Sequence, residues 1–430
     1  MGSPRASGTP KPTLPVWPEK VVGAKYVEIL QKQLDRLREQ DAHGNRKLFL
    51  DDVFIVSLLA FFNPTLRSLR TLEDFSQTRQ AQKHLSIRKL CRSTLSDFHQ
   101  LVDPVRLEPI LNALRTRLER HRPQGAKASD KLGELLQQAV AVDGTFLDAV
   151  ADVTWAIRCA NQRRSGQFRV RLDCHLSVVS WLPEVIVVPE AGTSESVSAA
   201  AHVQEGRLYL YDRGFNGYGL INAHYEEREG TAEPRAHFVA RYRSEGSNNT
   251  PSLIDTQDRP LTDADREAGV TSDREGRFQS SNPTRHALVD ARFREVIVSR
   301  LDRTGQPQTI RLITNLLDVP ADVIAHLYRH RWQIELFFRW LKCFANFDHL
   351  ISHNRQAVQA HFHVAVIGIL LMYLHNGYRP SKYLFALMSQ VAGGGAELDE
   401  ILPILQERER QSALARASAR RRAEKKRSGT

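Results

Sequence analysis

The feature that most constrains the fold is a change of hydrophobic pattern near residue 139. Residues 21–122 carry apolar side chains at helical spacing and show no strand signal. The next stretch, about a hundred residues, shows the short apolar runs and alternations typical of strands, interrupted by two helical segments. This order is typical of a mixed α/β core. The expected strands and helices are, in turn, three strands, helix, strand, helix and strand at residues 139–142, 168–177, 182–189, 194–203, 207–211, 218–227 and 237–242.

The chain beyond this core combines a polar segment with further patterned ones. Residues 244–285 are dominated by small polar and charged side chains, which predicts an inserted loop or a mobile region. Residues 293–300 and 309–314 then predict a β-hairpin. A long helix is expected over residues 318–344, begun by a capping aspartate and an early proline, and a further helix over residues 357–375.

The charge of the chain points to a polyanionic partner. Among 430 residues, 60 are Lys or Arg and 49 are Asp or Glu, a formal net charge of +11. A basic surface gains affinity for nucleic acids by releasing counterions from phosphates. Seven basic residues and one acidic residue stand together at residues 416–427. This tail is compatible with non-specific contacts to DNA and equally with a solvated end.

Composition also argues against several classes of protein. The apolar runs at residues 53–62 and 364–374 are well short of the roughly 20 residues that span a bilayer, so we expect no transmembrane helix and no membrane partner. Residues 1–20 hold five prolines and no apolar core, which predicts a disordered leader, no secretory signal and a cytoplasmic location. The four cysteines form no C-x-x-C pair, so neither a disulfide scaffold nor a structural zinc site is expected.

A possible DNA-reading element lies in the helical region. Residues 86–102 place a basic segment, a Ser-Thr helix start and a second helical pattern in the order of a helix-turn-helix, although an ordinary helical hairpin fits equally well. The predicted domains are a leader (1–20), a helical domain with this possible DNA-binding element (21–130), the mixed α/β core (131–243 with 316–378), an insertion (244–315) and a helical region with a basic tail (379–430).

The long helix carries a stripe of groups suited to phosphate chemistry. At 100° per residue, one carboxylate and three phosphate-binding groups share a sector about 60° wide. They are Tyr328, Arg331, Glu335 and Lys342. The adjoining sector is apolar and predicts a core face made of Leu327, Ile334, Phe337, Phe338, Leu341 and Phe344. A solvent-exposed helix face with an ion pair between Arg331 and Glu335, four residues apart, would show the same sequence pattern.

Two more carboxylates follow predicted strands. Asp143 and Asp212 each have a glycine within two residues, and each taken alone is typical of a turn. Together with Glu335 they offer three oxygen ligands on rigid elements, with positions left for water and phosphate. Such a set suits Mg²⁺, and two such ions about 3.5 to 4 Å apart can activate an attacking hydroxyl and stabilise a leaving oxygen.

These residues carry a family resemblance. The spacing Y-x2-R-x3-E-x6-K, from Tyr328 to Lys342, resembles the signature of the family-four DDE transposases of bacterial insertion sequences. The segments Val-Asp-Gly-Thr at residues 142–145 and Tyr-Asp-Arg-Gly-Phe at residues 211–215 are similar to that family's two aspartate motifs. The likeness extends over residues 137–347.

The resemblance implies a ribonuclease H-like mixed-sheet core with a mostly β insertion at residues 244–315. Asp143 would end the first strand and bridge two Mg²⁺ ions, which Mn²⁺ can replace, while Asp212 and Glu335 would each complete one ion. Tyr328, Arg331 and Lys342 would hold DNA phosphates. Trp332 would either stack on a base extruded from the DNA or pack within the protein, and the packing role is favoured.

The resemblance also implies an activity and its partners. The protein would bind the inverted-repeat ends of its own element in double-stranded DNA, cleave them and join the 3′ ends to target DNA. A homodimer on DNA, associated with the bacterial nucleoid, would follow. A catalytically inactive DNA-binding descendant is the alternative. A two-carboxylate glycosidase fits poorly with 8% aromatic residues and a basic charge.

Two further groups of residues give weaker indications of function. His326 and His330 stand four apart, as metal ligands on a helix can, but a surface pair is favoured. A basic run follows Asp143 and would either line a DNA channel or form an exposed hairpin. It consists of Arg158, Arg163, Arg164, Arg169 and Arg171.

Overall fold

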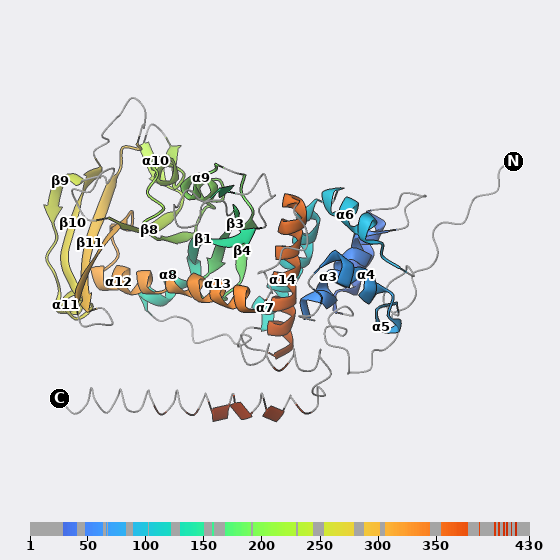
Figure 1. Cartoon of the computed structure of the whole chain (residues 1–430). Helices are drawn as coiled ribbons and strands as arrows, with labels where there is room; N and C mark the ends of the chain where they lie inside the picture. Colours follow the sequence, from blue (N-terminus) through green and yellow to red (C-terminus); the bar gives the residue numbers. More distant parts are fainter. Residues whose placement is uncertain are drawn as a thin grey trace. The chain divides into compact units, whose positions relative to one another are not determined.

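The fold is described from a computed structural model of the chain, which forms two units (Figure 1). One unit joins residues 1–118 to residues 343–430, and the other is residues 119–342. The predicted leader at residues 1–20 and the basic stretch 420–427 lie outside the described residues. The structure describes residues 29–40, 48–62, 66, 68–82, 89–101, 103–121, 130–149, 157–158, 168–190, 192–228, 231–243, 253–278, 288–301, 306–344, 354–376, 387, 400, 403–404, 407–408, 410–411, 414 and 418.

The second unit is built on one large mixed sheet. Its strands run in the order β2-β3-β1-β5-β8-β12-β11-β10-β9, with β4 paired to β3 at one side. β1 is antiparallel to β3 and parallel to β5, and β5 is parallel to β8. The strands at this end of the sheet are β1 (Ala139–Ala149), β2 (Ile157–Arg158), β3 (Phe168–Ser177), β4 (Pro183–Val187), β5 (Leu208–Tyr211) and β8 (His237–Tyr242).

Helices cover both faces of this sheet (Figure 1). α9 (Glu195–Ala200) and α10 (Tyr218–Asn222) lie on one face, over an apolar cluster that includes Val140, Tyr211 and Phe238. The other face carries α8 (Lys131–Gln138), α12 (Ala321–Arg329) and α13 (Trp332–Phe344). Because both faces are covered, the central strands are continuously apolar, as the burial of all four β5 residues illustrates.

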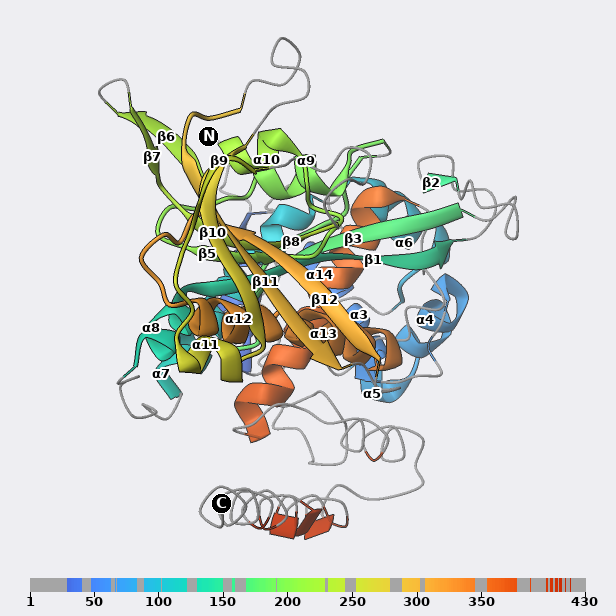
Figure 2. The same cartoon turned by 90° about the vertical axis from the view of Figure 1, so that its left-hand side faces the viewer.

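Two predictions in this region are wrong at the level of single elements. β1 does not end at Asp143 but continues to Ala149, because β3 pairs with it along its whole length and supplies the backbone partners that the local sequence does not signal. The helix expected to run to residue 227 ends at Asn222 as α10. It is followed by a two-stranded hairpin, β6 (Tyr225–Arg228) and β7 (Thr231–Pro234), which forms a sheet of its own (Figure 2).

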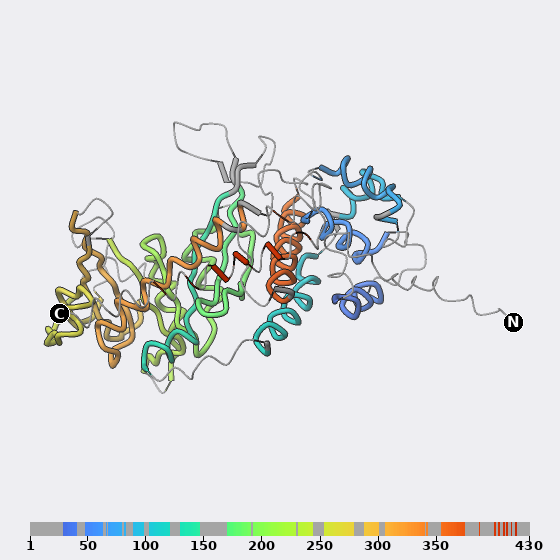
Figure 3. The backbone as a smooth tube through the Cα atoms, turned by 90° about the horizontal axis from the view of Figure 1, so that it is seen from below, coloured from blue at the N-terminus to red at the C-terminus, as the bar shows by residue number. Residues whose placement is uncertain are grey.

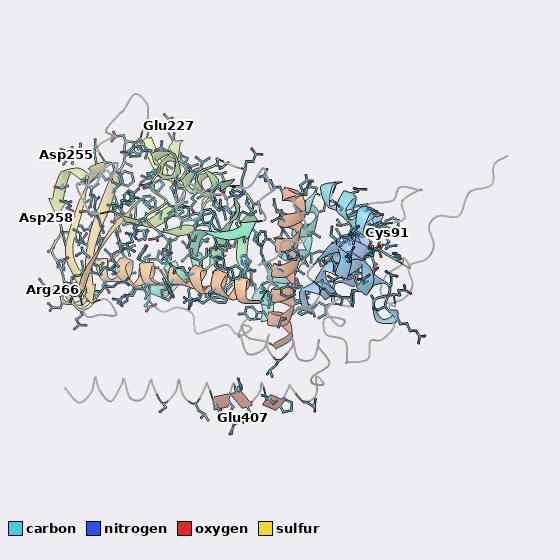
Figure 4. All side chains as sticks on the ribbon, viewed as in Figure 1. Cys91, Glu227, Asp255, Asp258, Arg266 and Glu407 are labelled. Atoms are coloured by element: carbon cyan, nitrogen blue, oxygen red, sulfur yellow. The ribbon has the colours of Figure 1, made fainter. Side chains whose placement is uncertain are left out.

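The segment at residues 244–285 is not an inserted loop where the structure describes it. It contains β9 (Leu253–Asp258), α11 (Asp263–Glu267) and β10 (Val270–Phe278), and β11 (Arg292–Leu301) and β12 (Pro307–Thr314) follow. β12 pairs with β8, so these strands continue the core sheet. Their polar composition reflects charge pairs across the strands, such as Arg294 with Asp273, and the exposed edge strand β9 with Asp255 and Asp258 (Figure 4).

The first unit is helical in its described residues. α14 (Arg355–Asn376) packs against α3, α6 and η1, so it belongs with these helices and not with the core to which residues 316–378 were assigned. By length and composition α14 is long enough to cross a membrane, contrary to expectation, but 72% of its apolar window is buried inside the protein. The other helices are α2 (Gln31–Glu39), α3 (Leu50–Phe62), α4 (Leu69–Ser76), α5 (Arg79–Gln82), α6 (Arg92–Leu101), η1 (Pro104–Leu107) and α7 (Glu108–His121).

The proposed helix-turn-helix is described only in part. Its second helix is present as α6, whereas residues 86–88 of the basic segment before it lie outside the described residues. The helix preceding that gap, α5, has four residues.

The single long helix expected over residues 318–344 is two helices. α12 and α13 follow one another along the sheet (Figure 3), separated at His330 and Arg331. Backbone N–H groups there donate to carbonyls three residues back, for example Arg331 to Tyr328 at 3.1 Å, which tightens the chain into a turn. The expected capping aspartate is also wrong, since Pro320 is the first residue outside α12 and no side chain caps it.

Candidate active site

Asp143 lies within β1, beside the parallel strand β5. Val142 is in register with Tyr211, so Asp143 and Asp212 occupy the next position on two neighbouring strands. The backbone N–H of Gly144 donates to Asp143 Oδ1 at 2.8 Å, and 24% of the Asp143 side chain is exposed. The sheet register therefore brings two carboxylates that are far apart in the sequence to adjacent positions.

Burial has a strong effect on Asp143. It raises the pKa of this carboxyl from 3.8 to about 7, although the positive charge of Arg331 and the hydrogen bond from Gly144 act in the opposite direction. The negative charges of Glu195 and Asp212 raise the pKa further. A carboxyl with such a pKa exchanges its proton near neutral pH, and a cation bound beside it would favour the ionised form.

Asp212 directly follows β5 and is held from two sides. The hydroxyl of Tyr328 donates to Asp212 Oδ1 at 3.2 Å, and Arg241 Nη1 on β8 lies 3.8 Å from the same oxygen. A third of the Asp212 side chain, 33%, is exposed. The carboxylate is thus oriented by α12 and β8 while one side remains open.

Arg331 links Glu335 to this pair of aspartates. Arg331 Nη2 donates to Glu335 Oε1 at 2.5 Å, and Nη1 lies 3.8 Å from Asp143 Oδ2. The side chain of Arg331 is 8% exposed, whereas that of Glu335 is 30% exposed. The turn between α12 and α13 is what buries Arg331, so the guanidinium lies among the carboxylates and not on a solvated helix face.

The other predicted site residues differ in burial. Tyr328 is buried and packs against the guanidinium of Arg331, with burial raising the pKa of its hydroxyl. Trp332 is 43% exposed, so part of its ring is open to solvent. Lys342 is exposed near the end of α13. The apolar sector is confirmed as a core face by the burial of Leu327, Ile334, Phe337, Phe338 and Leu341.

The donor set of the site fits a hard divalent cation by chemistry. Asp143, Asp212 and Glu335 offer partly exposed carboxylate oxygens, which Mg²⁺ prefers. Among the described residues, no group of three or more His, Cys, Asp or Glu side chains is arranged, as it stands, to hold a metal ion. Arg331 instead carries the compensating positive charge between Asp143 and Glu335.

Other candidates from the sequence do not join the site. Arg171 is buried in a two-pronged ion pair with Asp173 on β3, with distances of 2.8 and 3.1 Å, so it does not line a channel. The side chains of the other basic residues of that run lie outside what the structure describes. His326 Nδ1 lies 3.3 Å from Arg329 Nη1 across one helical turn, and both His326 and His330 are half-buried.

Three residues near the site carry no signal in the sequence. Glu195 begins α9, Arg241 lies on β8, and Trp181 follows β3. Trp181 Nε1 donates to Gln333 Oε1 at 2.9 Å, two residues before Glu335, and its ring meets Phe337 edge-on. These residues belong to segments far from the Y-R-E-K spacing, and only the folded sheet brings them near it.

A comparison of the sequence with known protein families places these site residues within one family. The family model described as "Transposase DDE domain" matches residues 134–371, more than half of the chain. The match spans β1, β5, α12 and α13, which carry Asp143, Asp212 and Glu335.

Individual relatives share shorter or more distant similarity. A putative transposase, y4zB, of Sinorhizobium fredii is 28% identical over 50% of this chain and 56% of its own length, so the chain spans about half of that relative. A probable transposase of insertion sequence element IS5377 from Geobacillus stearothermophilus is 36% identical over 17% of this chain and 20% of its own. A putative transposase for insertion sequence element IS4SA from Synechocystis is 34% identical over 16% of this chain and 23% of its own.

A solved structure gives a weaker likeness. The piggyBac transposase synaptic complex with hairpin DNA matches 85% of this chain and 76% of its own with a TM-score of 0.39 and 11% identity. The family itself is established by the sequence model, since it covers both aspartate motifs and the Glu335 helix. The chain is similar to transposases of bacterial insertion sequences over part of its length, and by the family model it belongs to the transposase DDE domain family.

Proposed function

We propose that the chain cleaves double-stranded DNA at the inverted-repeat ends of its own mobile element and joins the freed 3′ ends to target DNA. The observation that carries this proposal is the register of β1 and β5, in which Asp143 and Asp212 are neighbours, together with Arg331, which connects Asp143 to Glu335. The strand order β3-β1-β5-β8, with helices on both faces, supports a ribonuclease H-like core.

In this proposal the three carboxylates hold divalent metal, with Mg²⁺ as the natural ion and Mn²⁺ as a substitute. Asp143 would serve two ions, and Asp212 and Glu335 one each. Bound metal would supply the positive charge that activates water, and later a 3′-hydroxyl, for attack on phosphorus. The raised pKa of Asp143 supports this role, because ionising a buried carboxyl is costly until a cation compensates the charge.

The protein's own residues would position the DNA. Arg331 offers Nη1, which has no hydrogen-bond partner among the described residues, to a phosphate oxygen. Tyr328 orients Asp212 through its hydroxyl and supports the Arg331 guanidinium. Lys342 and the exposed Trp332 would contact the strand beside the cut, the first through a phosphate and the second through a base.

Pairing two DNA ends would require two copies of the chain, so we propose a homodimer on DNA. The net charge of +11 supports binding to DNA as such. A cytoplasmic, nucleoid-associated location follows from the same partner.

The test is cleavage of a linear duplex that carries the gene's own flanking DNA, with purified protein and Mg²⁺. Wild type should cut at discrete positions, and Glu335→Gln should retain DNA affinity but lose cleavage by at least about a hundredfold. Glu205→Gln, at an exposed position away from the site, is the matched control and should cut normally.

Two outcomes would overturn the proposal. Cleavage by Glu335→Gln at the wild-type rate would remove the metal role of that residue. Tight binding without cleavage by wild type, in Mg²⁺ and in Mn²⁺, would identify a non-catalytic DNA-binding descendant of a transposase.

A further inference from the structure

A fourth carboxylate lies beside the two aspartate motifs. Glu195 is the first residue of α9, which Ser194 caps by accepting a hydrogen bond from the Val197 N–H at 3.2 Å. A Cβ built on Gly144 would lie 2.9 Å from Glu195 Oε1, and one built on Gly214 would lie 3.1 Å from Oε2. The carboxylate of Glu195 therefore occupies the space that these two glycines leave open.

This arrangement gives the two glycines a physical reason. Gly144 follows Asp143 and Gly214 follows Asp212 by two residues, and neither has a positive φ that would by itself require glycine. An alanine at Gly144 would place its methyl group closer to Glu195 Oε1 than real Cβ atoms come to other atoms, so the carboxylate at the end of the Glu195 side chain would have to move away. The absent side chains let the fourth carboxylate approach the backbone beside both aspartates.

Glu195 acts electrostatically on both aspartates. Burial is the main cause of the raised pKa of Glu195; the positive charge of Arg171 opposes it, and the negative charges of Asp173 and Asp212 add to it. The negative charge of Glu195 is in turn one cause of the raised pKa of Asp143. Within the described part of the chain, the Glu195 carboxylate has no hydrogen bond or ion pair, in contrast to Asp173, which Arg171 holds through two bonds. Glu195 is thus the carboxylate near the aspartates that remains available for a ligand.

A second observation shows that this region is built for a ligand. Arg331 is 8% exposed, its Nη1 lies 3.8 Å from Asp143 Oδ2, and that nitrogen has no hydrogen-bond partner among the described residues. A buried donor without a partner is costly, so it indicates a group that arrives from outside. An anion bound by Arg331 would stand beside Asp143, where a cation held by carboxylates can share it.

From this geometry we propose that Glu195 is a fourth metal-binding carboxylate, which holds a divalent cation together with Asp143 and Asp212. The proposal rests on the metal-dependent function proposed above and extends its ligand set. Glu195 approaches from α9 on one face of the sheet and Glu335 from α13 on the other (Figure 1), so the two glutamates would complete the coordination from opposite sides of the aspartate pair. A set of carboxylates with water in the remaining positions is what Mg²⁺ or Mn²⁺ accepts.

The test measures Mn²⁺ binding to the full chain without DNA, from the loss of the electron paramagnetic resonance signal of free aqueous Mn²⁺. Glu195→Gln should weaken Mn²⁺ binding about tenfold or more, since even partners of metal ligands have effects of that size. Glu195→Asp should weaken it less, because the carboxylate is kept but withdrawn by one methylene. Glu205→Gln should bind Mn²⁺ as wild type does.

A second measurement separates a ligand from a structural residue. In chelator, Glu195→Gln should melt at the wild-type temperature or above it, because one of several neighbouring negative charges has been removed. In Mn²⁺ the same variant should gain less in melting temperature than wild type. A purely structural role, such as favouring the start of α9, would instead lower the melting temperature in chelator and leave the Mn²⁺ increment intact.

The outcomes separate this proposal from the proposed function. If Asp143→Asn weakens Mn²⁺ binding while Glu195→Gln binds normally, Glu195 is no ligand and the three-carboxylate site stands. If wild type binds no Mn²⁺, or no carboxylate variant changes its affinity, both the metal site and the role of Glu195 are refuted. A lower melting temperature of Glu195→Gln in chelator with an unchanged Mn²⁺ increment would also overturn the proposal.

Discussion

Asp143→Asn should stabilise the chain, and more at pH 8 than at pH 5. Burial raises the pKa of Asp143 from 3.8 to about 7, so the folded protein holds a proton that the unfolded chain has lost. The stability of wild type therefore falls as pH rises from about 4 to 7, and the loss is complete above the folded-state pKa. In the variant, the amide oxygen of asparagine can still accept the hydrogen bond from the Gly144 N–H. Because asparagine is uncharged, the variant does not lose stability at this position as the pH rises.

The size of the effect follows from the same two pKa values. Each pKa unit corresponds to about 1.4 kcal/mol, so the raised pKa of Asp143 lowers stability by at most about 4 kcal/mol at pH 8, where the folded carboxyl is ionised. At pH 5, where the folded carboxyl keeps its proton and the unfolded one has lost it, the cost is about 2 kcal/mol. Loss of the attraction to Arg331, 3.8 Å away, is already included in the pKa. The gain of the variant should thus be larger by about 2 to 3 kcal/mol at the higher pH.

The assay is urea unfolding followed by tryptophan fluorescence, in chelator, at pH 5 and pH 8. Asp258→Asn is the matched control, because Asp258 lies exposed on the edge strand β9 (Figure 4) and its substitution should change stability by less than about 0.5 kcal/mol. A gain for Asp143→Asn that is no larger at pH 8 than at pH 5 would show that burial does not control this carboxyl.

Two further predictions concern stability around the site. Arg294→Leu should lower the free energy of unfolding by about 3 to 5 kcal/mol, because it removes the two-pronged partner of Asp273 at a site where the two side chains are 2% and 4% exposed, and leaves only Arg259, 3.8 Å away. The double variant with Asp273→Leu should recover part of that loss in urea unfolding, and an equally unstable double variant would contradict the reasoning. Trp181→Phe should cost about 1 kcal/mol by removing the bond to Gln333 while keeping the edge contact with Phe337. A double-mutant cycle with Gln333→Leu should give a coupling of similar size, and zero coupling would show that this bond does not anchor α13.

Much of the core was predictable because local patterns decide it. The short apolar runs at the start of β1 and in β5 predict buried strands, and the alternation of apolar and polar residues in β3 predicts a strand by its period of two. The apolar sector of α13 likewise depends on helical periodicity alone. Asp143 and Asp212 could be singled out because each is a carboxylate that interrupts or ends such a run.

Element boundaries and partnerships depended on contacts distant in the chain. β1 passes Asp143 because β3 pairs with it, and the polar strands β9 and β10 exist because neighbouring strands supply their hydrogen bonds and opposite charges. α14 has an apolar sequence that fits several environments, and only packing against α3 assigns it to the helical unit.

The sequence by itself determined the chemical types at the site and their order along the chain, because the spacing of Tyr328, Arg331 and Glu335 is a local property. The tertiary structure decided how those groups face one another. The turn at His330 buries Arg331 against Glu335, the register of β1 and β5 makes Asp143 and Asp212 neighbours, and two glycines admit Glu195. Hydrogen-bond register and close packing are set between segments remote in sequence, so no local pattern contains them.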